Sequence, residues 1–128
     1  MITKYQFTRF QLLIGEHSKD IFHYFNVEEM HGLSLKEAEA YPETKHGAYI
    51  WGWCNYSPID GDMPFLFLNK TRWQKDYTDV TGIMHETMHL ALLLHNWDIE
   101  NKEEEIISDA ENIANEIVKL IKFHINII

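Results

Sequence analysis

His85-Glu86-Thr87-Met88-His89 is the part of the chain whose residue types and spacing are best suited to chemistry. It forms an H-E-x-x-H pattern, with the two histidines four residues apart. On a helix, residues four apart differ by about 40° in direction and about 6 Å in height, so two imidazoles can converge on one metal ion. Glu86 points about 100° away from His85, where its carboxylate can take a proton from bound water. The pattern therefore predicts His85 and His89 as ligands of Zn²⁺ and Glu86 as the catalytic base.

A catalytic zinc ion needs a third protein ligand, with its fourth position left for water. His95 has the spacing found in metzincins, but Leu90 to Leu94 simply continue the helix where that class turns at a glycine. On a continuous helix, His95 lies about 9 Å beyond His89 and about 120° around the axis. We therefore exclude His95 as a ligand and interpret it as a cation at the C-terminal end of the helix.

The next acidic pattern, Glu105-Ile106-Ile107-Ser108-Asp109, offers better candidates. A hairpin folded about residues 96 to 101 would bring Glu105 and Asp109 level with the two histidines. Glu105 would then complete the ligand set, and Asp109 would accept the outer N–H of a ligating imidazole, as most metal-bound histidines require. Glu104, Asp109 itself and Glu111 stay open as alternative third ligands.

Two helices must position these residues. The residues from 79 to 95 suit a helix, with Asp76, Thr78 or Asp79 as its cap, and residues 96–98 are polar enough to end it. Asn101 and Glu104 then form a capping-box pattern before a helix that reaches residue 123. Its apolar residues recur at three- and four-residue steps: Ile106, Ala110, Ile113, Ile117, Leu120 and Ile121. Because the connection is short, the two helices are expected to pack antiparallel.

The first half of the chain is expected to form a small sheet with short helices. Residues 7–14, 47–54 and 65–68 are typical of strands, and residues 56–63 of a loop. Ser18 is the expected N-cap of a helix through residue 26. Ser34 and Glu37 form a capping box before a second short helix, which Pro42 ends.

The composition limits the classes of partner. A length of 128 residues fits one domain over 1–128. Twenty acidic against eleven basic residues give a net charge of -9, which argues against nucleic acid or an anionic membrane as partner. Cys54 is the single cysteine, so no intramolecular disulfide is expected. No apolar run is long enough to span a membrane and no signal peptide is recognisable, so a cytoplasmic location is expected.

The two motifs together resemble the gluzincin metallopeptidases. Residues 104–109 are similar to the N-E-x-x-S-D element of thermolysin-like peptidases, with Glu104 where Asn is usual. The chain is similar in size to minimal gluzincins and to small HExxH proteins of phages and prophages, with a distant likeness to ImmA/IrrE metallopeptidases. The resemblance implies that zinc is held by His85, His89 and Glu105.

The same resemblance implies roles for other residues. Glu86 would be the general base, and Asp109 would hold a ligating imidazole in place. The strand formed by Phe65, Leu66, Phe67 and Leu68 would be the rim of the cleft and bind extended peptide by strand addition.

We therefore expect an α+β, zincin-like fold with a small mixed sheet, an active-site helix and an antiparallel glutamate helix. The expected function is zinc-dependent hydrolysis of a peptide or protein substrate by Glu86-assisted attack of zinc-bound water. The alternative is a non-catalytic or regulatory peptide- or protein-binding module on the same zinc-binding scaffold, and a zinc-free interaction protein is a third. So short a chain leaves little wall on the far side of the cleft, so we expect either a protein partner that completes the cleft or a very small substrate. Tyr56, Tyr77, His46 and His124 are candidates for stabilising the oxyanion, with no motif to choose among them.

Overall fold

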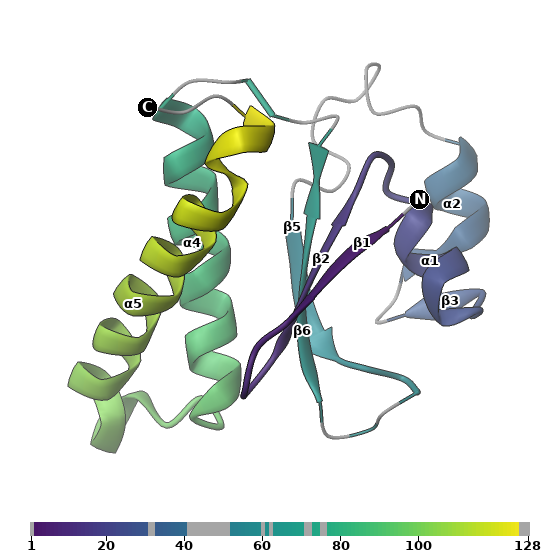
Figure 1. Ribbon diagram of the computed structural model, residues 1–128. Helices are drawn as coiled ribbons and strands as arrows, with labels where there is room; N and C mark the ends of the chain where they lie inside the picture. The colour runs from purple at the N-terminus through teal and green to yellow at the C-terminus, as the bar shows by residue number, and fades with distance from the viewer. Residues whose placement is uncertain are drawn as a thin grey trace. The chain divides into compact units, whose positions relative to one another are not determined.

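The computed structural model describes residues 2–30, 33–40, 52–59, 61, 63–70, 73–74 and 77–125, with the backbone alone for residues 30, 33, 40, 53 and 122–125. This part of the chain has a mixed α+β fold with a small mixed sheet of four strands and with four helices (Figure 1). The chain divides into two compact units, Met1–Arg72 and Trp73–Ile128, each of which is described by itself. The expectation of one domain over residues 1–128 stays a prediction.

The first unit is built on the four-stranded sheet, in the order β1-β2-β6-β5. Its strands are β1 (Thr3–Gln6), β2 (Gln11–Gly15), β5 (Gly52–Tyr56) and β6 (Pro64–Asn69). β2 and β6 are parallel, and the two outer pairings are antiparallel. A two-stranded ribbon, β3 (Glu29–Met30) and β4 (Leu33–Ser34), lies between the short helices α1 (Asp20–Phe25) and α2 (Leu35–Ala40) in the sequence.

The strand expected over residues 7–14 is a hairpin in the structure. Its second half is β2, while residues 7–10 form the turn that follows β1. The backbone N–H of Phe7 donates to the carbonyl of Phe10 at 2.9 Å, and the two rings stack with centroids 4.6 Å apart. The aromatic residues that suggested a continuing strand therefore close a turn. The strand expected over residues 65–68 is confirmed as β6, and that over residues 47–54 overlaps β5, with residues 47–51 outside the described part.

One apolar cluster holds the first unit together. It combines residues of β2, β6, α1 and α2, all buried: Leu13, Ile21, Phe22, Phe25, Ala38, Phe65 and Phe67. Gly15 at the end of β2 is required by close packing, because a Cβ there would lie 2.8 Å from the ring of Phe67. Ile21, Phe22 and Phe25 are the buried residues of α1.

The two short helices begin differently. α2 begins with the expected capping box: the backbone N–H of Glu37 donates to Ser34 Oγ at 3.0 Å, and that hydroxyl donates to Glu37 Oε1 at 3.0 Å. α1 begins one residue after Lys19, and no side chain caps it. The expected cap, Ser18, is buried and accepts a hydrogen bond from Asn69 Nδ2 at 3.3 Å. The Ser18 prediction is therefore wrong, because this hydroxyl contacts β6.

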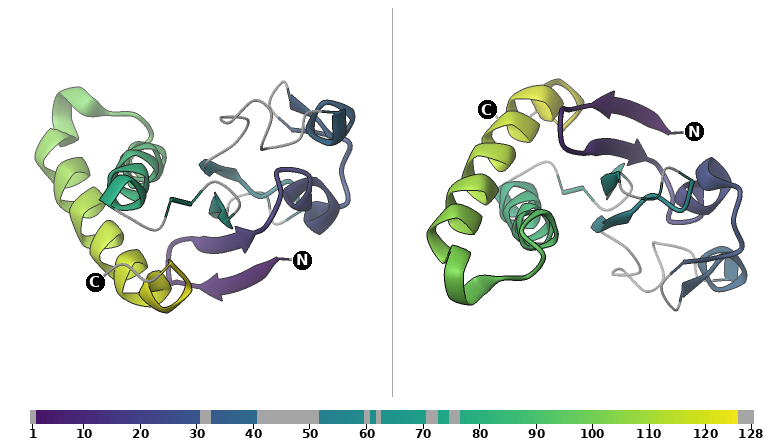
Figure 2. Two further views of the ribbon diagram at one scale, coloured as in Figure 1. Left: turned by 90° about the horizontal axis from the view of Figure 1, so that it is seen from above. Right: turned by 90° about the horizontal axis from the view of Figure 1, so that it is seen from below.

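The second unit is an antiparallel hairpin of α4 (Tyr77–Leu94) and α5 (Ile99–Ile125), which lie side by side (Figures 1 and 2). Both predicted helices are confirmed, and α4 begins two residues earlier than expected. Asn96 and Trp97, with φ of 55° and 60°, end α4 where the polar residues predicted a break. The buried side of α5 is close to the predicted apolar face: Ile106, Ala110, Ile113, Ala114, Ile117 and Ile121.

The start of α5 differs from the prediction. The carboxylate of Asp98 accepts the backbone N–H of Asn101 at 3.3 Å and its side-chain Nδ2 at 3.1 Å, so Asp98 supplies the cap. Lys102 then departs from helical geometry, with φ of -129° and ψ of 20°, and kinks the helix after its first turn. The capping box expected from Asn101 and Glu104 is therefore wrong. None of the helices described here combines the length and apolar character that a membrane crossing requires.

Candidate metal centre

His85 and His89 project from the middle of α4 and converge. Their Nε2 atoms are 3.2 Å apart, and the rings meet edge to face with centroids 4.8 Å apart and planes at 73°. Zn–N bonds of about 2.0–2.1 Å at tetrahedral angles place two nitrogen atoms about 3.3 Å apart. The helix therefore holds the two imidazoles at the separation that one zinc ion requires, which is what the four-residue spacing predicts.

The pair is open to solvent. The side chain of His85 is 68% exposed, and His89 is exposed as well. Partial burial of the His89 ring, with a smaller contribution from the neighbouring His85, lowers the pKa of His89. A lowered pKa keeps this imidazole neutral at neutral pH, and neutral imidazole is the form that binds metal.

Glu86 is the buried neighbour of this pair. Only 8% of the residue is exposed, and its Oε1 lies 3.9 Å from His85 Nε2. Burial raises the pKa of its carboxyl group, and the charge of His85 lowers it to a smaller extent. A carboxylate whose pKa is raised is a stronger base, and is therefore better suited to accept a proton from a reacting group.

The acidic residues predicted on the second helix lie elsewhere. Glu105 is exposed, and its Oε2 pairs with Lys102 Nζ at 3.3 Å. Asp109 Oδ2 lies 2.6 Å from Nε2 of His95, the histidine that the spacing excludes as a ligand. Among the residues that the structure describes, no three His, Cys, Asp or Glu side chains gather as a metal site. The alternative ligands Glu104 and Glu111 are likewise exposed and outside any such group.

The contact between His95 and Asp109 fixes which residues of the two helices are level. His89 precedes His95 by six residues, and Glu105 precedes Asp109 by four. Since a helix rises about 1.5 Å per residue and the helices are antiparallel, Glu105 is displaced from His89 by about 15 Å along the hairpin. The structure therefore has a different register from the predicted one, and α5 has a kink at Lys102, before Glu105. Glu105 does not complete the ligand set in this structure, and Asp109 supports His95.

The predicted rim strand also needs correction. β6 pairs with β2 on one edge and with β5 on the other, and Phe65, Leu66, Phe67 and Leu68 are all fully buried. A peptide can add to a sheet only where backbone N–H and C=O groups are free. The prediction that these four residues bind peptide by strand addition is therefore wrong.

Comparisons with protein-family models, curated proteins and solved structures found no match.

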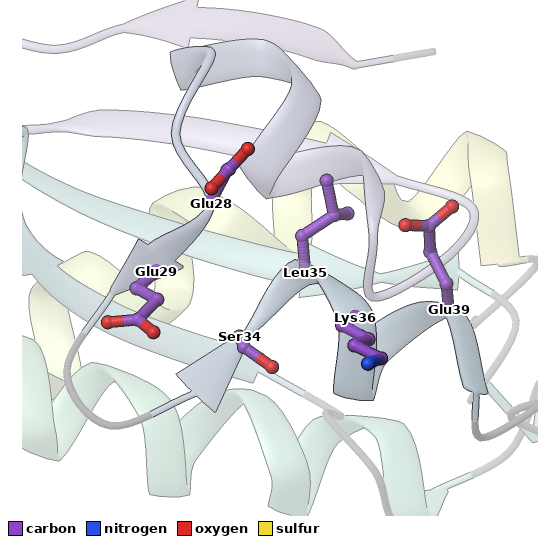
Figure 3. Close-up of a pocket in the computed structure, with 6 residues that line it drawn as sticks. All are labelled: Glu28, Glu29, Ser34, Leu35, Lys36 and Glu39. Atoms are coloured by element: carbon purple, nitrogen blue, oxygen red, sulfur yellow. The ribbon is translucent and has the colours of Figure 1, made fainter.

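Tyr77 and Tyr56 are the two oxyanion candidates whose side chains the structure describes. Tyr77 is 74% exposed in the first turn of α4, and Tyr56 is 37% exposed on β5. His46 and the side chain of His124 lie outside the described part of the chain. A cavity of about 430 Å³ in the first unit contains none of the predicted site residues (Figure 3). It is lined by Glu28, Glu29, Ser34, Leu35, Lys36 and Glu39.

Two features of this region were not predicted from the sequence. The pairing of His95 with Asp109 depends on the helix register, which no local pattern encodes. The exposed side of α4 has no Lys, Arg, Asp or Glu side chain, and this could have been found by marking these residues on a helical projection of residues 77–94.

Proposed function

We propose that this chain is a zinc-dependent peptidase in which His85 and His89 hold the ion and Glu86 is the general base. The observation that carries the proposal is the 3.2 Å separation of the two Nε2 atoms on the exposed side of α4. The buried carboxyl group of Glu86 beside them supports it. Packing alone gives no reason to place a buried acid between two exposed histidines.

The proposed scaffold is zincin-like, with α4 as the active-site helix. The mixed sheet of the first unit and the helical hairpin of the second are consistent with it. The resemblance to gluzincins is retained for residues 85–89 but loses support at Glu105 and Asp109, which the register places away from the histidines. The third ligand would be identified by substituting the acidic and histidine residues one at a time and measuring zinc affinity.

Zinc, when bound, supplies a water of lowered pKa and polarises a carbonyl group. The contribution of the chain itself is proton transfer. Glu86 would accept the proton of the attacking water and deliver it to the amine that leaves when the peptide bond breaks. Its burial suits the first step, because a carboxylate of raised pKa is a stronger base.

The test combines metal analysis with one conservative substitution. The purified protein, loaded with zinc, should retain the ion after desalting and hydrolyse members of a mixed peptide library. Glu86→Gln should retain zinc as the unchanged protein does and lose hydrolysis. Glu104→Gln, the same substitution at an exposed position on α5, should retain both. Failure to retain added zinc, or full activity in Glu86→Gln, would refute the proposal.

The second candidate is a non-catalytic, zinc-binding module. Structural zinc sites use four protein ligands and leave no open position. The exposed side of α4 carries few charged residues, whereas a surface that stays in water usually carries many. This side therefore favours a module whose α4 surface is covered by a bound peptide or protein. Zinc retention without hydrolysis of any library peptide would support this module over the peptidase.

A further inference from the structure

The exposed side of α4, here called the α4 face, has an unusual composition. Every residue of α4 is described, and those that are exposed are Tyr77, Thr78, Thr81, Met84, His85, Met88 and His89. None is Lys, Arg, Asp or Glu, in a chain in which 24% of the residues are charged. Low charge together with methionine and aromatic residues is typical of the centre of a protein interface. The composition indicates a surface that a protein partner covers.

Apolar side chains on this face adjoin the histidine pair. Met84 directly precedes His85, Met88 directly precedes His89, and the two methionines are 38% and 36% exposed. Tyr77, two turns before Met84, is 74% exposed. Methionine is flexible and adapts its shape to a facing surface. A partner that contacted the histidines would therefore bury apolar side chains at the same time.

The number of metal ligands suggests which partner this is. The described residues offer two nitrogen atoms at the edge length of a zinc tetrahedron, and no third protein ligand. A closed zinc site has four ligands. A second copy of the same face, related by a two-fold axis through the ion, would supply two more nitrogen atoms at the same separation. No acidic or basic side chain of the α4 face would be buried without a partner in such a contact.

We propose that two copies of this chain share one zinc ion between their α4 faces, with His85 and His89 of each copy as its four ligands. This inference rests on the proposed metal binding by the same histidines. It makes the dimer a closed form of the proposed peptidase, because four protein ligands leave no position for water. The monomer, with its own zinc ion, would be the open form.

The experiment measures molar mass by light scattering after gel filtration while zinc is added to the metal-free protein. The mass should double, with the largest dimer fraction at half a zinc ion per chain. A large excess of zinc should return the protein to monomers, because each chain then binds its own ion. EDTA should also restore the monomer, and His89→Ala should stay monomeric throughout.

A matched pair of substitutions distinguishes a contact through the α4 face from a general effect of added charge on dimerisation. Met88→Lys puts a charge on the α4 face and leaves both histidines in place, whereas Asn112→Lys makes the same change in charge on the exposed side of α5. Met88→Lys should weaken zinc-dependent dimerisation at least tenfold and still bind one zinc ion per chain. Asn112→Lys should dimerise as the unchanged protein does.

Any other result would overturn the inference, and the results also distinguish failure of the shared site from failure of zinc binding. A monomer that binds one zinc ion per chain at every zinc concentration would refute the shared site and leave the proposed peptidase intact. A dimer that EDTA does not dissociate, or that Met88→Lys does not weaken, would refute the metal bridge through the α4 face. A protein that binds no zinc would refute both proposals.

Discussion

The two helices of the hairpin differ most in the surfaces they expose. The exposed residues of α4 include no acidic or basic side chain apart from its histidines. Most exposed residues of α5 are charged: Glu100, Lys102, Glu103, Glu104, Glu105, Glu111, Glu116 and Lys119. Both helices have a continuous buried side as well, so the contrast is confined to the surface away from the core. The helix with few charges is the one that carries the histidine pair.

This difference bears on the meaning of the net charge of -9. Residues 98–116 contain eight acidic residues and one lysine, and the sequence suggests that some of these acids bind the metal. In the structure, Glu103, Glu104 and Glu105 lie exposed in the first turns of α5, where the helix dipole favours negative charge. These three acidic residues are therefore explained as part of a solvated helix start, and the metal proposal depends on the geometry of α4.

The largest expected effect is the loss of metal binding when α4 is altered. His89→Ala removes one of the two converging nitrogen atoms, so zinc affinity should fall by at least about 100-fold. Glu105→Ala and Glu104→Ala should each change the affinity less than about threefold, because both residues are exposed away from the pair. Competition with a chromophoric zinc chelator measures all three variants. A loss in Glu105→Ala similar to that in His89→Ala would show that α5 contributes a ligand and that the two helices share the site.

The same contrast shows which parts of the site could be predicted from the sequence. The convergence of His85 and His89 follows from helical geometry within five residues, so a local pattern is sufficient. The position of Glu105 depends on the number of residues between the helices and on the kink at Lys102. The kink is a backbone feature of a residue with no special conformational preference, and the sequence does not reveal it.

The same limit applies to the first unit. Residues 65–68 were predicted as a strand because they are apolar, and the prediction is confirmed. Their place between β2 and β5 depends on pairing with segments far away in the sequence. Strand order is non-local information, so the apolar pattern does not distinguish an interior strand from one at the rim of a cleft.

The next largest effect is on the stability of the hairpin, through the contact between His95 and Asp109. Asp109→Ala removes the carboxylate that lies 2.6 Å from His95 Nε2, where both side chains are mostly buried. The loss should reduce the free energy of unfolding by about 2 kcal/mol, because a charge-assisted hydrogen bond is lost and His95 is left without this acceptor. Urea denaturation measures the change. Ser108→Ala, at the exposed neighbouring position, should change the free energy by less than about 0.5 kcal/mol. Equal stability of the two variants would show that this pair does not hold the register.

A smaller effect is expected at the start of α5. Asp98→Ala removes the acceptor of the Asn101 backbone N–H and should reduce the free energy of unfolding by about 1 kcal/mol. Asn101→Ala, which keeps that backbone bond and loses only the bond from its side chain, should cost less. Urea denaturation of the two variants at one pH gives the comparison. If Asn101→Ala costs more than Asp98→Ala, the cap predicted from the sequence is correct after all.

The smallest expected effect is on the pH dependence of stability in the metal-free protein. It distinguishes the buried Glu86 of α4 from the exposed acidic residues of α5. Burial raises the pKa of Glu86 above its ordinary value of 4.5, so the folded chain binds this proton more tightly than the unfolded chain does. The resulting stability is present below the ordinary pKa and is lost as the pH rises through the raised pKa. Glu86→Gln should therefore match the unchanged protein in acid and be more stable than it at neutral pH, as urea midpoints at the two pH values would show. Glu104→Gln makes the same substitution at an exposed position on α5 and is the matched control. A Glu86→Gln variant that is less stable at neutral pH would mean that the ionised carboxylate stabilises the fold, and a structural role would then be enough to explain its place between the histidines.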